Sequence, residues 1–127
     1  MSVDELIEGS KSLGLDGICL TDHDVFWTDE EIRELSSKHD FLVIPGCKIN
    51  TESGHVLVFG LSGYEFGMHR AEFLRLSVDQ VEGVMIAAHP YRRRFLEEPA
   101  EKPEARQEML ERACGDGFFR MCQGIEA

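Results

Sequence analysis

Hydrophobic positions along the chain form two patterns: spaced stripes typical of amphipathic helices, and short continuous runs typical of buried strands. A spaced stripe over residues 3–13 follows Ser2-Val-Asp-Glu5, a capping box in which serine and glutamate satisfy the first free amides of a helix. A second capping box, Thr28-Asp-Glu-Glu31, opens another helix that ends near residues 38–39. Continuous apolar runs predict strands at 17–21, 41–44 and 84–88.

A hairpin is predicted after Pro45-Gly46, which bends the second of these strands. Residues 47–50 and 55–61 would form its arms around a turn at 51–54. If Asn50 pairs opposite His55, then Lys48 and His55 share a face as diagonal neighbours, roughly 7–8 Å apart. A shift of one residue would place them on opposite faces, so their proximity depends on this register.

The remaining segments carry weaker patterns. They predict a loosely helical stretch at 64–82, a loop with three prolines at 90–103, a helix at 104–113, and one more strand from Phe118-Phe119 and 124–127. The alternation of helices and buried strands predicts an α/β fold with right-handed crossovers and a mainly parallel sheet. The length of 127 residues predicts one domain over residues 1–127.

Composition narrows the function classes. The formal net charge of -11 argues against generic nucleic-acid binding, which needs a basic surface. We expect no secretory leader and no membrane span, because no apolar run has the required length. The four cysteines lack Cys-x-x-Cys spacing, and Cys19 and Cys47 lie in expected strands. They are therefore interpreted as buried thiols of a reducing, cytoplasmic environment.

Candidate chemistry lies where strands end. Asp22, His23 and Asp24 directly follow the first strand, and His89 directly follows the strand at 84–88. Ligands of α/β proteins bind at the carboxyl ends of strands, and imidazole with carboxylate suits Zn, Mn or Fe. Each histidine alone is equally well interpreted as a structural residue. Asp22 and Asp24 could orient His23 or bind metal, and Asp24 could instead cap the following turn.

A basic run follows His89, and Arg92 is a candidate phosphate contact, with a solvated basic loop as the alternative. Glycine-rich phosphate loops and nucleophile elbows do not occur in the sequence, so nucleophilic serine or cysteine chemistry has no support.

Three segments resemble successive motifs of the polymerase and histidinol phosphatase (PHP) superfamily. They are Gly17-Ile-Cys-Leu-Thr-Asp-His-Asp24, the segment from Ile44-Pro-Gly-Cys-Lys48 through Gly54-His55 to Gly60, and Ala87-Ala-His-Pro-Tyr-Arg92. The resemblance implies a distorted seven-stranded βα barrel, of which about five strands are present. It also implies hydrolysis of phosphate mono- or diesters by metal-activated water. By this resemblance, His23, His55 and His89 would be metal ligands and Arg92 would contact phosphate. Asp22 and Arg92 are the candidate catalytic residues.

The chain departs from this pattern at three places. The first His-x-His strand and the last Asp-x-His motif of the family are missing, so we expect a domain truncated at both ends. Lys48 stands where the family usually has a glutamate that bridges two metals. An ammonium there opposes metal binding, so we expect one divalent ion at most, or none, unless Lys48 is carbamylated.

These departures leave two functions open. The chain is either a phosphoesterase acting on a small phosphorylated substrate or nucleotide, or a degenerate PHP module that binds an anion or a protein partner without catalysis. The missing first strand also predicts an exposed sheet edge, which self-association or rearranged elements would cover.

Overall fold

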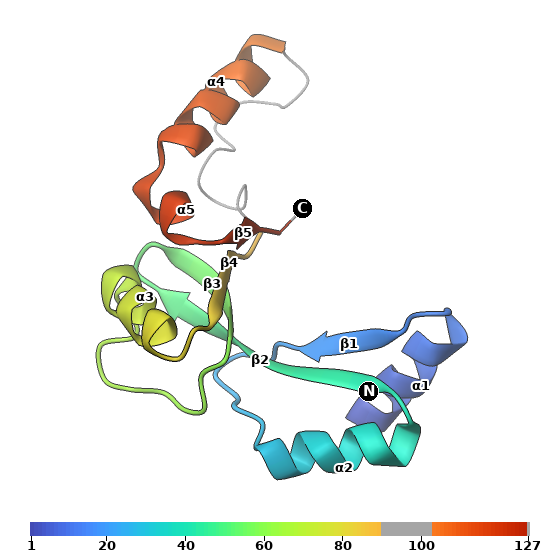
Figure 1. The fold of residues 1–127 in the computed structure, drawn as a ribbon. Coiled ribbons are helices and arrows are strands. Elements are labelled where there is room, and N and C mark those ends of the chain that lie inside the picture. The colour runs from blue at the N-terminus through green and yellow to red at the C-terminus, as the bar shows by residue number, and fades with distance from the viewer. Residues whose placement is uncertain (90–102, 127) are drawn as a thin grey trace.

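The structure of the protein is a computed structural model that describes residues 1–89 and 103–126. Helices and strands alternate along most of the chain (Figure 1). In order they are α1 (Val3–Ser12), β1 (Gly17–Leu20), α2 (Asp29–His39), β2 (Leu42–Thr51), β3 (Gly54–Phe59), α3 (Ala71–Gln80), β4 (Val84–Ala87), α4 (Pro103–Gly115), α5 (Gly117–Met121) and β5 (Gly124–Ile125).

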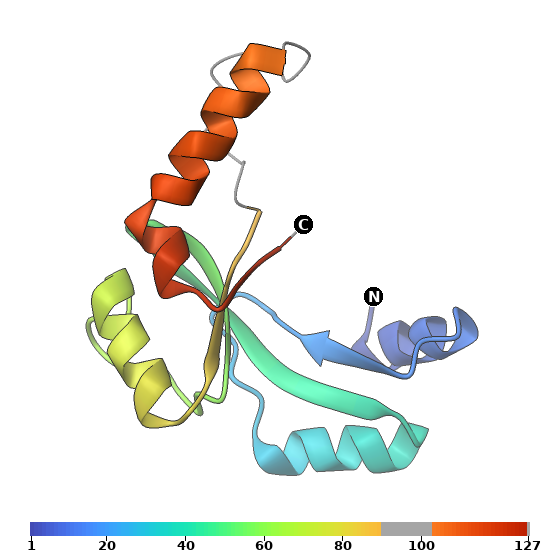
Figure 2. The same ribbon diagram turned by 45° about the horizontal axis from the view of Figure 1, so that its top comes forward.

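The five strands form one curled, open sheet in the order β1-β2-β3-β4-β5 (Figure 2). The pairs β1–β2 and β4–β5 are parallel, whereas β2–β3 and β3–β4 are antiparallel. The expectation of a mainly parallel sheet is therefore wrong, because the tight turn between β2 and β3 forces the strands it joins to run antiparallel. The predicted α/β class and partial barrel with five strands are confirmed.

Helices cover one face of this sheet. Val43, Cys47 and Ile49 alternate along β2 and are buried on that face. Leu42 and Ile44 point to the opposite face and are 58% and 39% exposed. The sheet therefore has a helix-covered face and a face that the described helices leave uncovered, as in one half of a barrel with its helices outside.

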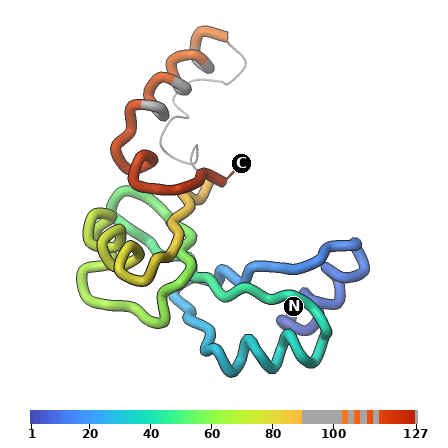
Figure 3. Tube along the Cα trace, viewed as in Figure 1, coloured from blue at the N-terminus to red at the C-terminus, as the bar shows by residue number. Residues whose placement is uncertain are grey.

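Two separate clusters of buried side chains fill the covered face. The smaller one joins Ile7 of α1 to Leu20 and Val43 of β1 and β2. The larger one packs α3 and α5 against β2, β3 and β4 and includes Leu74, Phe118 and Phe119. The chain trace places α1 and α2 at the β1 end of the sheet and β5 at the other end (Figure 3).

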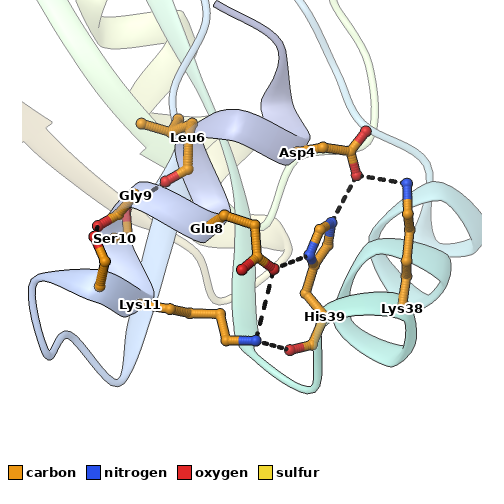
Figure 4. Close-up of polar contacts among 9 residues, drawn as sticks. Asp4, Leu6, Glu8, Gly9, Ser10, Lys11, Lys38 and His39 are labelled. Carbon is orange, nitrogen blue, oxygen red and sulfur yellow. Dashed lines mark hydrogen bonds and ion pairs between the residues drawn. The ribbon is translucent and has the colours of Figure 1, made fainter.

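Both predicted capping boxes are present. Ser2 and Glu5 cap α1 reciprocally, and Thr28 and Glu31 do the same for α2. The two helices are also joined by polar contacts around His39, which lies between two carboxylates of α1 (Figure 4).

Three local expectations were wrong. Only Ala71–Gln80 of the stretch 64–82 is helical, because Gly67 adopts a φ of +102° that interrupts a right-handed helix. Phe118 and Phe119 lie in α5 instead of a strand, since the Asp116 carboxylate caps that helix by accepting from the Phe118 amide at 2.8 Å. Cys19 is exposed because it lies on the uncovered face.

The predicted loop at 90–103 lies almost entirely outside the described residues. Of the helices the structure describes, none is long and apolar enough to cross a membrane.

Candidate functional site

The candidate site begins where β1 ends. The parallel pairing of β1 with β2 continues past Leu20, because the Lys48 amide donates to the Asp22 carbonyl at 2.9 Å and the Asp24 amide donates to the Lys48 carbonyl at 3.1 Å. His23 and Lys48 form the bridge between these two bonds. Residues paired in this way point to the same face of a sheet, so His23 and Lys48 lie side by side.

The hairpin register brings His55 to the same face. Asn50 pairs opposite His55, the register on which the predicted proximity depended. Lys48 and His55 therefore share a face as diagonal neighbours, and that expectation is confirmed. The face is the one that the helices leave uncovered.

The end of β4 adds the third imidazole. The Ala88 amide donates to the His55 carbonyl at 3.0 Å and continues the pairing of β3 with β4 up to His89. His55 Nδ1 then lies 3.0 Å from His89 Nε2, a hydrogen bond whose donor depends on the tautomers. The ring centroids are 4.8 Å apart for His55 and His89, and 5.5 Å apart for His23 and His55.

Three strand ends thus bring together the three histidines that the sequence singled out, with His55 in the middle. His39 and His69, which the sequence set aside, lie elsewhere: His39 is bound to α1, and His69 lies 3.8 Å from Glu52. The pairing of strands explains the cluster: His23 and His55 are 32 positions apart and His55 and His89 are 34 apart, so they meet only once the sheet has formed.

Asp22 does not face the imidazoles. Adjacent residues of an extended chain point to opposite faces, and the Asp22 carboxylate accepts a hydrogen bond from the Trp27 indole at 3.1 Å. Trp27 packs against the smaller core cluster. Asp22 thereby ties the loop before α2 to the covered side of the sheet, and its predicted catalytic role stays a prediction.

Lys48 is half-buried on the same face as His23 and His55. Within residues 1–89 and 103–126, its ammonium forms no hydrogen bond or ion pair. It is therefore a cation available to a ligand at this face. Arg92, the predicted phosphate contact, lies outside the described residues.

Glu126 is a site residue that the sequence analysis missed. Its carboxylate oxygen Oε2 accepts a hydrogen bond from the His89 amide at 2.7 Å. The sequence carried a signal for Glu126, because it directly follows β5. His89 and Asp22 have similar places, each separated by one residue from the end of β4 or β1.

Cys47 lies beneath this site on the covered face. Burial raises the pKa of its thiol, and the nearby Asp24 carboxylate raises that pKa further by opposing a second negative charge. Cys47 is therefore a packed thiol that takes no part in the candidate chemistry.

The donor set suits one divalent ion better than two or three. Three neutral imidazoles are good ligands for Zn or another transition metal. The Asp22 carboxylate is bound to Trp27 and the Glu126 carboxylate to the His89 amide, and Lys48 adds a positive charge. In the part of the chain that the structure describes, no three histidine, cysteine or acidic side chains are grouped so as to hold a metal ion. The His55 and His89 rings contact each other directly and would have to turn to share an ion.

Comparison with known proteins identifies solved structures with a similar fold. No family model and no curated protein matches the chain. A solved structure from Bifidobacterium adolescentis, described as a candidate metal-dependent phosphoesterase, superposes with a TM-score of 0.62 at 15% identity over 97% of this chain and 70% of that one. A two-domain protein from Bacteroides vulgatus, described as containing a predicted PHP-like metal-dependent phosphoesterase, gives 0.59 at 20% identity over 94% and 37%.

The chain therefore shares its fold with part of these structures and forms a partial barrel of the PHP type. At these identities the similarity establishes the fold, and the activity of this chain rests on its own residues.

Proposed function

We propose that the face bearing His23, His55 and His89 is a phosphoester site of the PHP type, which holds one divalent metal ion and acts on phosphate mono- or diesters. The observation that carries this proposal is the meeting of the three imidazoles from three strand ends. The fold shared with proteins described as metal-dependent phosphoesterases supports it.

Each residue has a proposed part. The three imidazoles would hold Zn, Mn or Fe, and such an ion would supply a Lewis acid and lower the pKa of a bound water. Lys48 would bind a phosphate oxygen through its ammonium, and Arg92 would bind a second oxygen. The substrate would be a small phosphorylated molecule or nucleotide, because a net charge of -11 disfavours binding of a long polyanion. The site would act in the cytoplasm.

A second candidate function is anion binding without catalysis. Lys48 favours it, since this half-buried cation on the imidazole face opposes a multinuclear metal site and attracts an anion. The two functions differ in their need for a metal ion, because only the phosphoesterase requires one for turnover.

The test combines metal analysis with an activity assay. Protein purified without chelator is analysed for bound metal, and hydrolysis of an aryl phosphate is measured with added manganese. The phosphoesterase requires about one ion per chain and turnover that His55→Ala abolishes and the control His69→Ala retains. Phosphate binding with neither metal nor turnover would instead establish the anion-binding function.

A further inference from the structure

His89 holds an unusual backbone conformation. Its φ is +30°, in the left-handed region that residues with a Cβ adopt rarely. Such a conformation costs free energy and persists only where the surrounding structure holds it. The turn comes directly after β4 and sets the direction in which the His89 ring leaves the sheet.

Glu126 contacts the chain just before this turn and at the amide where the turn begins. Its amide donates to the Ala87 carbonyl at 2.8 Å, and its carboxylate accepts from the His89 amide at 2.7 Å. In a regular parallel ladder, the His89 amide would donate to the main-chain carbonyl of Glu126. Here the side chain of the same residue accepts that bond, which allows the backbone at His89 to turn out of the ladder.

This arrangement connects β5 to the imidazole cluster. The turned His89 places Nε2 3.0 Å from Nδ1 of His55, whose carbonyl accepts from Ala88. A hydrogen bond from an amide to a carboxylate is stronger than one between neutral groups, so it can offset the cost of the left-handed turn.

We propose that Glu126 is the positioning residue of the imidazole cluster: its carboxylate fixes the backbone of His89 so that the His89 ring meets that of His55. The inference deepens the proposed function and rests on it only where metal binding is concerned. Glu126 acts through the backbone of His89, and its own oxygens are not ligands in this role.

The test compares Glu126→Ala, Glu126→Gln and the surface control Glu72→Ala by NMR of the imidazole nitrogens and protons. In the wild type we expect a through-space contact between the His55 and His89 rings and one tautomer for each. Glu126→Ala should lose both signals. Glu126→Gln should keep them, because its amide oxygen can accept the same hydrogen bond, and Glu72→Ala should match the wild type.

Zinc binding by calorimetry gives a second readout. Glu126→Ala should bind zinc about tenfold to a hundredfold more weakly, as is usual for residues that orient metal ligands, whereas Glu126→Gln should stay near the wild type. Glu126→Asp, which withdraws the carboxylate by one methylene, should show the same loss as Glu126→Ala with less disturbance of β5.

The outcomes separate the two proposals. Loss of the ring contact in Glu126→Ala, together with no zinc binding by any variant, would support positioning and overturn the metal-binding function. A ring contact that survives in Glu126→Ala, or that is lost equally in Glu126→Gln, would overturn the positioning role.

Discussion

At the scale of single residues, Lys48 decides what kind of ligand the imidazole face prefers. Lys48→Glu exchanges a cation for a carboxylate beside His23 and His55. We expect it to raise the affinity for zinc at least tenfold, about 1.4 kcal/mol, and to weaken phosphate binding. Lys48→Gln should fall between the two. Calorimetry with zinc and with inorganic phosphate measures both effects.

The control for Lys48→Glu is Arg33→Glu, which makes the same change in charge at an exposed position of α2. Arg33→Glu should change the affinities for zinc and for phosphate only by the small amount expected from the change in net charge. Equal zinc affinities for wild type and Lys48→Glu would show that Lys48 is not close enough to influence the imidazoles.

Thiol reactivity tests which face of the sheet is open. Cys19 is exposed on the uncovered face, whereas burial raises the pKa of both Cys47 and Cys122. In a Cys114→Ser background, a thiol reagent at pH 8 should therefore label Cys19 in the native protein. Cys47 and Cys122 should react at least tenfold more slowly until denaturant is added. Rapid labelling of native Cys47 would contradict the burial of this face.

At the scale of elements, α1 and α2 are joined through His39, whose side chain is 7% exposed. Nδ1 lies 2.7 Å from Glu8 and Nε2 lies 2.6 Å from Asp4 (Figure 4). A neutral imidazole can donate from only one nitrogen, so two carboxylate partners favour the imidazolium. Lys38 also binds Asp4, and Lys11 binds the His39 carbonyl.

This contact predicts how stability depends on pH. Hydrogen bonds to Asp4 and then Glu8 raise the pKa of His39 above its ordinary value of 6.5. The stability it contributes is complete below pH 6.5 and is lost as the pH rises through the raised value. Hydrogen bonds from Lys38 and His39 lower the pKa of Asp4, and one from His39 lowers that of Glu8, so their contribution is lost only in acid.

We therefore expect maximum stability between about pH 4.5 and 6.5, with a decline above that range. Urea unfolding from pH 4 to 9, followed by circular dichroism, measures it. His39→Gln, which keeps one hydrogen-bonding nitrogen and cannot be protonated, should remove the decline. The control His69→Gln should retain it, and an unchanged profile in His39→Gln would contradict the role of this contact.

The elements that sequence patterns predicted best are those with local signals. Both capping boxes and the β2–β3 register depend on residues close in sequence, and the structure has them. Phe118-Phe119 resembled a strand because paired aromatics favour strands, but the Asp116 cap and burial against α3 and β4 make it helical. The place of Glu126 after β5 could be recognised from the sequence, but its contact with the His89 amide could not, because it depends on the left-handed turn at His89 and on β5 lying beside β4.

At the scale of the whole molecule, the site could be predicted in outline because its histidines lie at the ends of paired strands. His23 and His89 come after β1 and β4, and His55 lies at the start of β3. The convergence of three histidines required only the order of strands and one hairpin register. Their ring contacts and the outward turn of Asp22 toward Trp27 follow from packing, which the sequence does not specify.

The uncovered face of the half-barrel leads to the last prediction. Leu42, Ile44 and Val84 are 58%, 39% and 39% exposed, and β1 forms an open edge of the described sheet. We expect two chains to associate through this face, and a charge of -11 on each chain to oppose the association. Because salt shortens the range of repulsion from about 10 Å at 0.1 M to 3 Å at 1 M, dimers should increase with salt.

Sedimentation velocity at both salt concentrations measures this association. Ile44→Glu should abolish the association, because it places a charge in the apolar face. The control is Leu76→Glu, which makes the same kind of change on α3, where Leu76 is 63% exposed and lies outside that face. A monomer at both salt concentrations would contradict the prediction and show that the uncovered face remains exposed to water. Association that Leu76→Glu disrupts and Ile44→Glu does not would move the interface from the open sheet face to the helical side.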